Sequence, residues 1–336
     1  MSLTQPKQRI KWYRSPVSRE ELAMLNQRSD WKGFAQTGGH LGLLILSSVL
    51  AWMAAENQAW GWLILILFIH GTMYHFLLNA FHELCHSSVF KTKALNVFFL
   101  RLISFLSLHN PVAFWASHQE HHKYTLHPPD DLEVIFPVHL PLGGFLQSIV
   151  INPWGFWQRF KGAWRLSNGQ IDGEWMQYLF REDDKLKRDL ILWARIHLYG
   201  HAALLVVSLA LGYWMIPVLI TFANFYGGWL LYLCNTTQHI GLQDEVADYR
   251  LCTRTIILNP VVRFLYWHMN YHIEHHMYAA VPCYNLGKLH TLIKDDLPHC
   301  PNGLYETWSV ILGILKKQKE DPTYQYMPEL PNFAAV

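Results

Sequence analysis

Nine histidines in this sequence occur at spacings that suit metal binding. They are His82, His86, His118, His121, His122, His239, His272, His275 and His276. Eight of them lie in three short stretches, "FHELCH" at 81–86, "HQEHH" at 118–122 and "HIEHH" at 272–276. Because helix positions i, i+3 and i+4 share one face, each stretch directs its histidines toward a common point. Nine imidazoles are about what two metal ions of four or five ligands each require.

The H-x-x-H-H spacing is the specific part of this pattern. With 20 His in 336 residues, it should occur by chance roughly 0.07 times, yet it occurs twice. The H-x-x-x-H spacing alone does not indicate a metal site, because "HLYGH" (His197 and His201) repeats it at the start of an apolar stretch. We interpret His197 and His201 as polar residues facing a neighbouring helix or the membrane interface. His70 and His75 are interpreted as hydrogen-bonded packing residues, and His127 as a residue near the second stretch without an assigned role.

Two further interpretations use the same histidines. "FHELCH" also matches the helix of a zinc protease, in which His82 and His86 hold the metal and Glu83 is the base. That interpretation leaves both H-x-x-H-H stretches without a role. A histidine-rich metal transporter is the other, but no ligand cluster lies at mid-membrane depth, where transporters bind their substrates.

The number of histidines favours iron. Imidazole suits zinc, copper, iron and nickel alike, but nine histidines exceed the three or four ligands of a zinc site. Soluble di-iron carboxylate proteins repeat Glu-x-x-His on two helices, whereas here that spacing occurs within the histidine clusters once, from Glu83 to His86. An all-histidine, two-metal site is therefore predicted.

Composition places these histidines in a membrane protein. Charged residues make up 15% of the chain, apolar residues 51% and aromatic residues 15%, a profile unlike that of an average soluble domain. No Asp, Glu, Lys or Arg occurs in 33–55, 57–82 or 196–243. Since a span needs about 20 apolar residues, we predict an all-α membrane protein with four transmembrane helices. Their approximate bounds are 35–55, 58–81, 196–213 and 216–236. Pro217 suits the first turn of the last one.

The basic residues predict the orientation. All 27 Lys and Arg fall in 1–32, 84–195 or 244–336, which four crossings place on one side. The positive-inside rule then makes this side cytoplasmic, so that both termini and the histidines face the cytoplasm, at the inner membrane if the source is bacterial. Residues 82–195 and 244–336 would form a cytoplasmic helical cap that holds the histidine-rich di-metal site.

Other features limit the alternatives. The apolar stretches 95–108 and 134–157 are broken by Arg101 or by prolines and glycines, and we predict helices at the cytoplasmic interface. The five cysteines form no C-x-x-C pair, which argues against a zinc ribbon, an iron-sulfur site or a disulfide framework. The net charge of +2 gives no indication of nucleic acid, and no cleaved signal peptide is expected. One membrane domain, 1–336, is predicted.

Together these stretches resemble the three histidine boxes of the membrane fatty acid desaturase superfamily, which also holds alkane hydroxylases and carotenoid ketolases. The resemblance covers roughly residues 60 to 300, and "NYHIEHHMYAAVP" at 270–282 is especially similar to the third box of bacterial desaturases. "NTTQHIGL" at 235–242 is similar to the segment with an extra ligand. By this resemblance His239 is the ninth ligand, Asn235 reaches the metal through a water, and four long helices stand under a cytoplasmic cap.

The resemblance implies an O2-dependent oxidoreductase with two Fe2+ ions. We expect an acyl-lipid or fatty acid desaturase. The alternative is a membrane hydroxylase or ketolase acting on an alkane, terpenoid or other small organic substrate, to which "HEL" and "NTTQHIGL" are similar. The residues themselves do not distinguish desaturation from hydroxylation or identify the substrate.

Two further expectations concern the surroundings of the metals. Glu83, Glu120 and Glu274, one in each box, are candidates to accept the second N–H of a ligand imidazole. The chain has no motif for an iron-sulfur cluster, flavin or nicotinamide, so a separate ferredoxin or cytochrome b5 type donor, with its reductase, is implied. The basic pairs Lys91 with Lys93 and Lys316 with Lys317 are candidate docking points for it, although membrane anchoring explains them equally well.

Overall fold

The computed structural model describes residues 9–134, 146 and 149–331, and in these residues it is helical, without strands. The helices are α1 (Arg19–Leu25), α2 (Asp30–Glu56), α3 (Trp60–His75), α4 (Leu77–Cys85), α5 (Lys93–Ser107), α6 (Pro111–Tyr124), α8 (Pro153–Ser167), α9 (Glu174–Leu179), α10 (Asp184–Ala210), α11 (Met215–Leu219), η1 (Phe222–Phe225), α12 (Trp229–Asn235), α13 (Tyr249–Cys252), α14 (Pro260–Leu265), α15 (His272–Met277), α16 (Cys283–Ile293), η2 (Lys294–Asp296) and α17 (Gly303–Glu320).

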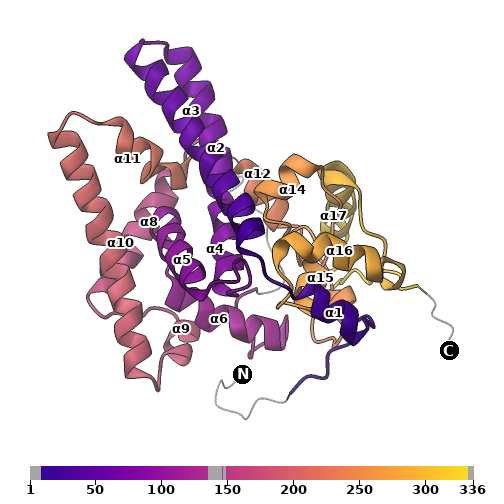
Figure 1. The fold of residues 1–336 in the computed structure, drawn as a ribbon. Coiled ribbons are helices and arrows are strands. Elements are labelled where there is room, and N and C mark those ends of the chain that lie inside the picture. Colours follow the sequence, from indigo (N-terminus) through magenta and orange to yellow (C-terminus); the bar gives the residue numbers. More distant parts are fainter. Residues whose placement is uncertain (1–8, 135–145, 147–148, 332–336) are drawn as a thin grey trace.

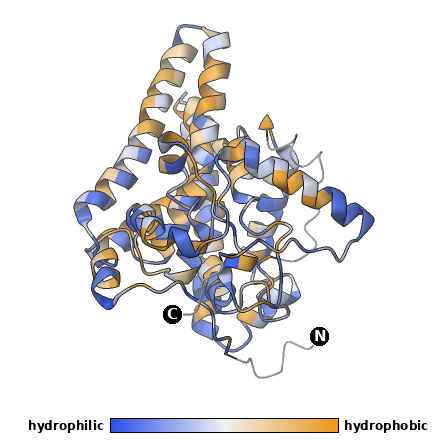
Figure 2. Cartoon of the chain, turned by 90° about the vertical axis from the view of Figure 1, so that its right-hand side faces the viewer, coloured by the Kyte–Doolittle hydropathy of each residue, from blue (hydrophilic) through white to orange (hydrophobic). Residues whose placement is uncertain are grey.

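Three helical segments among the described residues have the length and composition of membrane spans. They are α2, the nearly continuous pair α3 and α4 (Trp60–Cys85), and α10, with 27, 26 and 27 residues. At 1.5 Å per residue each is about 40 Å long, more than a bilayer core of about 30 Å requires. Helices α2 and α3 form an antiparallel pair that projects from the body of the molecule (Figure 1), and Figure 2 shows apolar residues along both of them. The first three predicted spans therefore coincide with long apolar helices.

The prediction of one continuous helix over 216–236 is wrong. This segment consists of α11, η1 and α12, and only Pro217 lies where it was expected, in the first turn of α11. The breaks follow from close packing on α3. Gly227 has a φ of +73°, and a Cβ there would lie 2.8 Å from the backbone nitrogen of Thr72. A side chain at Gly71 would in turn lie 2.3 Å from the carbonyl oxygen of Tyr226, so two glycines allow the backbones to touch where a regular helix would not fit.

The two apolar stretches predicted at the interface have different outcomes. Residues 95–107 lie in a helix, α5, whose axis is bent by 104° from that of α6. Counted as one bent span, α5 and α6 would supply a fourth crossing among the described residues. Most of 134–157 lies outside the described residues, but α8 begins at Pro153 and exposes Trp154, Trp157 and Trp164. The position of these helices relative to the membrane stays a prediction.

Helix α4 lies at the centre of the molecule. Eight of its nine residues are buried, and Phe81 and Leu84 have no exposed surface. They belong to a hydrophobic core that also contains Ile103 from α5 and Ile273 from α15. This packing fixes α4 against α5 and α15, and so it sets the positions of the histidines that α4 and α15 carry.

Candidate metal centre

Four segments bring the nine predicted histidines together. Helix α4 carries His82, with His86 at its C-cap; α6 and α15 carry the two H-x-x-H-H stretches; His239 lies in the turn after α12. Helix α6 has a well-formed start, because the side chain of Asn110 accepts hydrogen bonds from the amides of Val112 and Ala113 and Pro111 occupies the first position. Seven of the nine histidines are buried, and His86 and His122 are half-buried.

Five histidines form a first cluster, in which the possible ligand atoms all lie within 4.8 Å of one another. They are His82, His86, His118, His122 and His275. His118 stands at the centre of this cluster. Its Nε2 atom lies 2.7 Å from Nε2 of His82, 3.2 Å from Nε2 of His86 and 3.0 Å from Nε2 of His122. The Nε2 atom of His275 lies 3.2 Å from that of His122.

The other four histidines form a second cluster beside the first. Ligand atoms of His121, His239 and His276 lie within 4.8 Å of one another. His272 joins them, because its Nε2 atom lies 3.0 Å from Nε2 of His239 and 3.1 Å from Nε2 of His276. The rings of His122 and His276 are stacked with centroids 4.6 Å apart, which makes the two clusters neighbours.

The protonation pattern makes these clusters suitable for cations. His82, His118 and His121 each turn Nδ1 toward a carboxylate, at 3.1, 2.9 and 2.8 Å. His239 turns Nδ1 toward the carbonyl oxygen of Cys252, at 2.9 Å. An Nδ1 that donates there leaves the Nε2 lone pair of a neutral ring facing the cluster. Lone pairs that face one another repel unless a cation lies between them. Two nitrogens that bind one ion at about 2.1 Å lie about 3.0 to 3.4 Å apart. The set of donor atoms therefore fits metal ions.

Burial favours the neutral rings that metal binding needs. Burial, together with the neighbouring His121, lowers the pKa of His239 to about 3. Burial and the neighbouring histidines also hold the pKa values of His272, His275 and His276 well below the usual range. At neutral pH these four side chains are unprotonated and available as ligands.

The three glutamates predicted beside the ligands have different partners. Glu83 is buried, and its Oε1 atom lies 3.1 Å from Nδ1 of His82 and 3.8 Å from Nδ1 of His275. Glu120 instead forms an ion pair with Lys123 at 2.8 Å. The buried Glu274 accepts a hydrogen bond from the hydroxyl of Thr255 and pairs with His290. Among the contacts of the described residues, that of Glu83 with His82 is the one expected.

Two carboxylates next to the histidines were not predicted for this role. Asp131 contacts His121, and Glu133 contacts His118. Burial alone would raise the pKa of Asp131, but His121 and the backbone amides of Leu126 and Glu133 outweigh it and lower the pKa. The available signal was the run "PPDDLE" at 128–133, which places two carboxylates two residues apart soon after the second histidine stretch. A P-P-D-D run is also typical of an ordinary turn, so the sequence alone does not single out Asp131.

Asn235, which was predicted to reach a metal through a water, contacts Tyr266 and Asn79. Its Oδ1 atom lies 3.3 Å from the hydroxyl of Tyr266 and 3.4 Å from Nδ2 of Asn79. Asn79 is on α4, one turn before the histidines of that helix. The role of Asn235 as a ligand through water stays a prediction.

The histidines that were not assigned as ligands have polar partners outside the two clusters. Nδ1 of His201 lies 2.8 Å from Oγ1 of Thr221, and its Nε2 atom lies 2.9 Å from the carbonyl oxygen of Phe105. His70 lies between Ser47 and Leu219, and His75 contacts the carbonyl oxygen of Gly71. His197 lies 3.5 Å from Ser104, and His127 contacts the carbonyl oxygen of Thr125. These contacts agree with the interpretation of His70, His75, His197 and His201 as packing residues.

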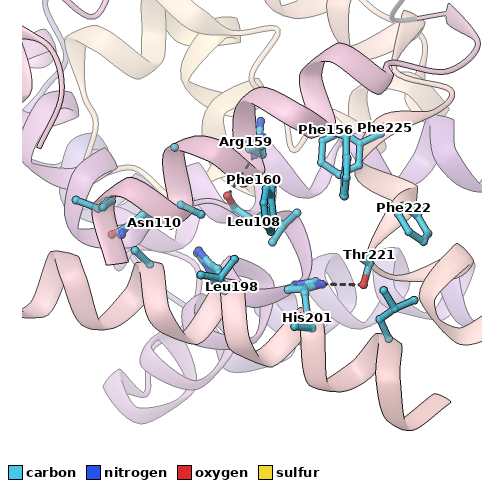
Figure 3. A pocket seen from close by; sticks show the side chains of 17 residues that line it. Leu108, Asn110, Phe156, Arg159, Phe160, Leu198, His201, Thr221, Phe222 and Phe225 are labelled. Atoms are coloured by element: carbon cyan, nitrogen blue, oxygen red, sulfur yellow. Dashed lines mark hydrogen bonds between the residues drawn. The ribbon is translucent and has the colours of Figure 1, made fainter. Parts of the chain in front are cut away.

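A largely apolar cavity of about 390 Å³ lies between α8, α10 and the segment from α11 to η1. Figure 3 shows Phe156, Phe160 and Phe222 on its walls and the hydrogen bond between His201 and Thr221. Arg159 also lines it and donates to the carbonyl oxygen of Leu108 at 3.2 Å. Asn110, which lines the cavity, is the N-cap of α6. His118 follows eight residues later, about 12 Å along the helix.

In its described residues the chain is helical, with three apolar helices of membrane-spanning length and nine clustered histidines. These features define a class of membrane protein with a candidate metal centre. The model of the family described as "Fatty acid desaturase" matches residues 57–308. This range contains every histidine of both clusters. The chain therefore belongs to the fatty acid desaturase family, and it is a desaturase-type oxidoreductase with several apolar membrane helices.

Among curated proteins, the chain is similar to the Delta(6)-fatty-acid desaturase fat-3 of Caenorhabditis elegans. The two are 25% identical over 168 residues, which cover 44% of this chain and 38% of that protein. The match thus spans well under half the length of the relative, and it supports the family rather than a particular substrate.

Proposed function

We propose that this protein is an O2-dependent di-iron oxidoreductase that desaturates fatty acyl chains in a membrane. The observation that carries the proposal is the pair of adjacent histidine clusters, five side chains in one and four in the other, whose Nε2 atoms converge. Such a number of nitrogen ligands suits two ions, and the family supplies the choice of iron and of an acyl substrate.

In this proposal the chain holds one iron with His82, His86, His118, His122 and His275, and the other with His121, His239, His272 and His276. When bound, the irons supply the activation of O2 for removal of hydrogen from an unactivated C–H bond. Glu83, Glu133 and Asp131 hold the rings of His82, His118 and His121 in the orientation that presents Nε2. Seven of the nine ligand candidates are buried, which limits the access of water to them.

The cavity beside α6 is the candidate site for the hydrocarbon part of the substrate. Its walls are mostly apolar, and α6 connects it to His118. Phe114 lies on α6 between the cavity and His118. Its ring is 4.7 Å from that of His118 and 5.0 Å from that of Phe81. An acyl chain in this cavity would contact apolar side chains along its length, as a lipid substrate requires.

The burial of Glu83 argues against the zinc protease. A catalytic base of that kind must reach a water molecule on the metal, whereas the carboxylate of Glu83 has 1% of its surface exposed and lies against Nδ1 of His82. The five-histidine cluster also exceeds the ligand number of a catalytic zinc.

The test is expression in cells, purification in detergent and three measurements. We expect about two irons per chain, O2 consumption that depends on a reduced electron carrier, and a new double bond in cellular lipids. A hydroxylated or ketone product would assign the alternative chemistry within the same superfamily. One zinc per chain, with peptide cleavage, would overturn the proposal.

The remaining parts of the proposal concern the surroundings of the enzyme. The chain forms one membrane domain with both termini and the histidine clusters on the cytoplasmic side. A separate ferredoxin or cytochrome b5 type protein, with its reductase, supplies the electrons.

A further inference from the structure

A polar hollow lies on the surface next to the first histidine cluster. Its volume is about 850 Å³, and the metal-ligand candidate His122 forms part of its wall. The N-terminal segment supplies three exposed basic residues, Arg9, Lys11 and Arg14, and α6 supplies Lys123. This segment lies at the end of the molecule opposite the turn between α2 and α3 (Figure 1).

The hollow has a basic character. Among the described residues that line it, four are Lys or Arg and none is Asp or Glu. The ion pair with Glu120 offsets one of these charges, that of Lys123. The other three project from one short stretch of chain, so they present a concentrated positive field to a molecule approaching His122.

Two stacked aromatic rings connect this surface with the histidines. The rings of Trp12 and Tyr249 are 4.1 Å apart and nearly parallel, at 9°. Trp12 is half-buried and lines the hollow, whereas Tyr249 is 1% exposed. The ring of Tyr249 lies 5.4 Å from that of His276, and its hydroxyl donates to the carbonyl oxygen of His122 at 3.0 Å. Tyr249 thus contacts residues of both histidine clusters.

Hydrogen bonds and a cation–π contact hold the N-terminal segment in this place. Nε1 of Trp12 donates to the carbonyl oxygen of Lys123 at 2.9 Å, and the backbone amide of Tyr13 donates to the carbonyl oxygen of Ala247 at 2.9 Å. The guanidinium of Arg250 packs on the ring of Tyr13 at 3.9 Å. The segment is therefore fixed across the chain beside α6 and α13, and Arg9, Lys11 and Arg14 are exposed there.

We propose that this hollow is the docking site of an acidic one-electron carrier protein, and that Trp12 and Tyr249 form a packed route from that carrier to both histidine clusters. The inference rests on the proposed function, since only a redox-active centre needs such a partner. In each docking event the carrier is oxidised by one electron and the centre is reduced by one, without a bond being made or broken. Two events supply the two electrons that one O2 requires.

The alternative basic pairs lack these features. Lys316 and Lys317 lie near the end of α17, where Lys317 packs on Tyr324. They line neither of the two cavities described above. They are therefore a matched control of equal charge for the docking site.

The first experiment measures binding to the intact iron-loaded protein in lipid nanodiscs. The probes are two acidic carriers, a plant-type ferredoxin and the soluble domain of cytochrome b5, each at several salt concentrations. The double charge reversal Arg9→Glu with Lys11→Glu should weaken binding of at least one carrier about tenfold or more and flatten its salt dependence. Lys316→Glu with Lys317→Glu should change binding less than twofold. Equal effects of the two pairs, or no binding of either carrier by the unaltered protein, would overturn the docking site.

The second experiment measures how fast the carrier reduces the metal centre after rapid mixing. Trp12→Leu should slow this reduction about tenfold at saturating carrier while leaving carrier affinity and reduction by dithionite unchanged. Trp12→Phe, which retains a ring, should recover most of the rate. An unchanged rate in Trp12→Leu refutes the route. If the unaltered protein binds the carrier but takes up no electron, the proposed function fails and the docking site stands.

Discussion

Nδ1 of His121 lies 2.8 Å from Oδ2 of Asp131, and both side chains are buried. The carboxylate is itself held by the backbone amides of Leu126 and Glu133, each at 2.9 Å. The ring of His121 is therefore fixed by a group that the backbone has already positioned. This arrangement directs Nε2 of His121 toward His239 and His276, and it makes Asp131 a positioning residue for the second cluster.

We expect Asp131→Asn to weaken metal binding in the second cluster by about 10 to 100-fold, the usual effect of losing a carboxylate behind a ligand histidine. The amide retains an acceptor but loses the charge that favours donation from Nδ1. Competition with a chelator measures the affinity. Asp130→Asn, next to it in the same turn, should leave the affinity unchanged, and equal losses in both variants would remove the role assigned to Asp131.

The clusters also predict which histidines matter. His275→Ala and His276→Ala should each lose metal and all product formation, because each removes one converging nitrogen. His201→Ala should keep both metals. It should still lower stability by about 1 to 3 kcal/mol, because Thr221 and the carbonyl oxygen of Phe105 lose a buried partner. Metal content per folded protein separates the two outcomes, and a His275→Ala variant with full activity would contradict the assignment.

The close approach of α3 to the segment before α12 gives a prediction about the fold. Gly71→Ala should destabilise the protein by about 1 to 3 kcal/mol, because the added methyl group meets the backbone of Tyr226 at 2.3 Å. Gly61→Ala, in the same helix, meets nothing within 4 Å and should be neutral or slightly stabilising. Thermal unfolding in detergent measures both changes. Similar unfolding temperatures for the two variants would show that the close packing is absent.

The orientation is tested with accessible tags. If both termini and the histidine clusters face the cytoplasm, tags at residue 1 and after residue 336 should react only with reagents on that side, and a cysteine at Gln58, in the turn between α2 and α3, should react only from the other side. Protection of either terminus would exclude the orientation. This prediction depends on the charge distribution, since all Lys and Arg are outside 33–83 and 196–243.

The sequence predicted the histidines well because their spacing is local. A helix brings i, i+3 and i+4 together whatever surrounds it, so His118, His121 and His122 required no knowledge of the fold. The division into two clusters was not predictable. His121 and His122 are adjacent in sequence and belong to different clusters, and that separation depends on how α6 packs against α15.

The unpredicted features depend on contacts between distant segments. The break at Gly227 arises where the chain presses against Thr72 of α3, and apolar composition alone could not distinguish it from a continuous span. Asp131 was recognisable as a turn residue, but its contact with His121 depends on the path of the loop. Trp12 is a similar case, because its ring meets Tyr249 across more than two hundred residues.

The last prediction concerns Glu83, whose carboxylate separates the metal site proposed here from a zinc protease. Glu83→Gln should retain both metals, because a Gln side chain still offers a carbonyl oxygen to Nδ1 of His82. Product formation should fall by about tenfold at most, the low end for a residue behind a ligand. His86→Ala, which removes a ligand candidate from the same helix end, should lose metal and activity together.

The comparison is decisive because the two chemistries require different things of one carboxylate. A protease base must take a proton from water, which an amide cannot do, so Glu83→Gln would be inactive with its metal in place. As a partner of His82, Glu83 has only to accept a hydrogen bond. Metal content and O2-dependent product, measured side by side in Glu83→Gln and His86→Ala, distinguish the roles. A Gln variant that keeps its metals and is as inactive as His86→Ala would give Glu83 a direct chemical role and refute its assignment as a positioning residue.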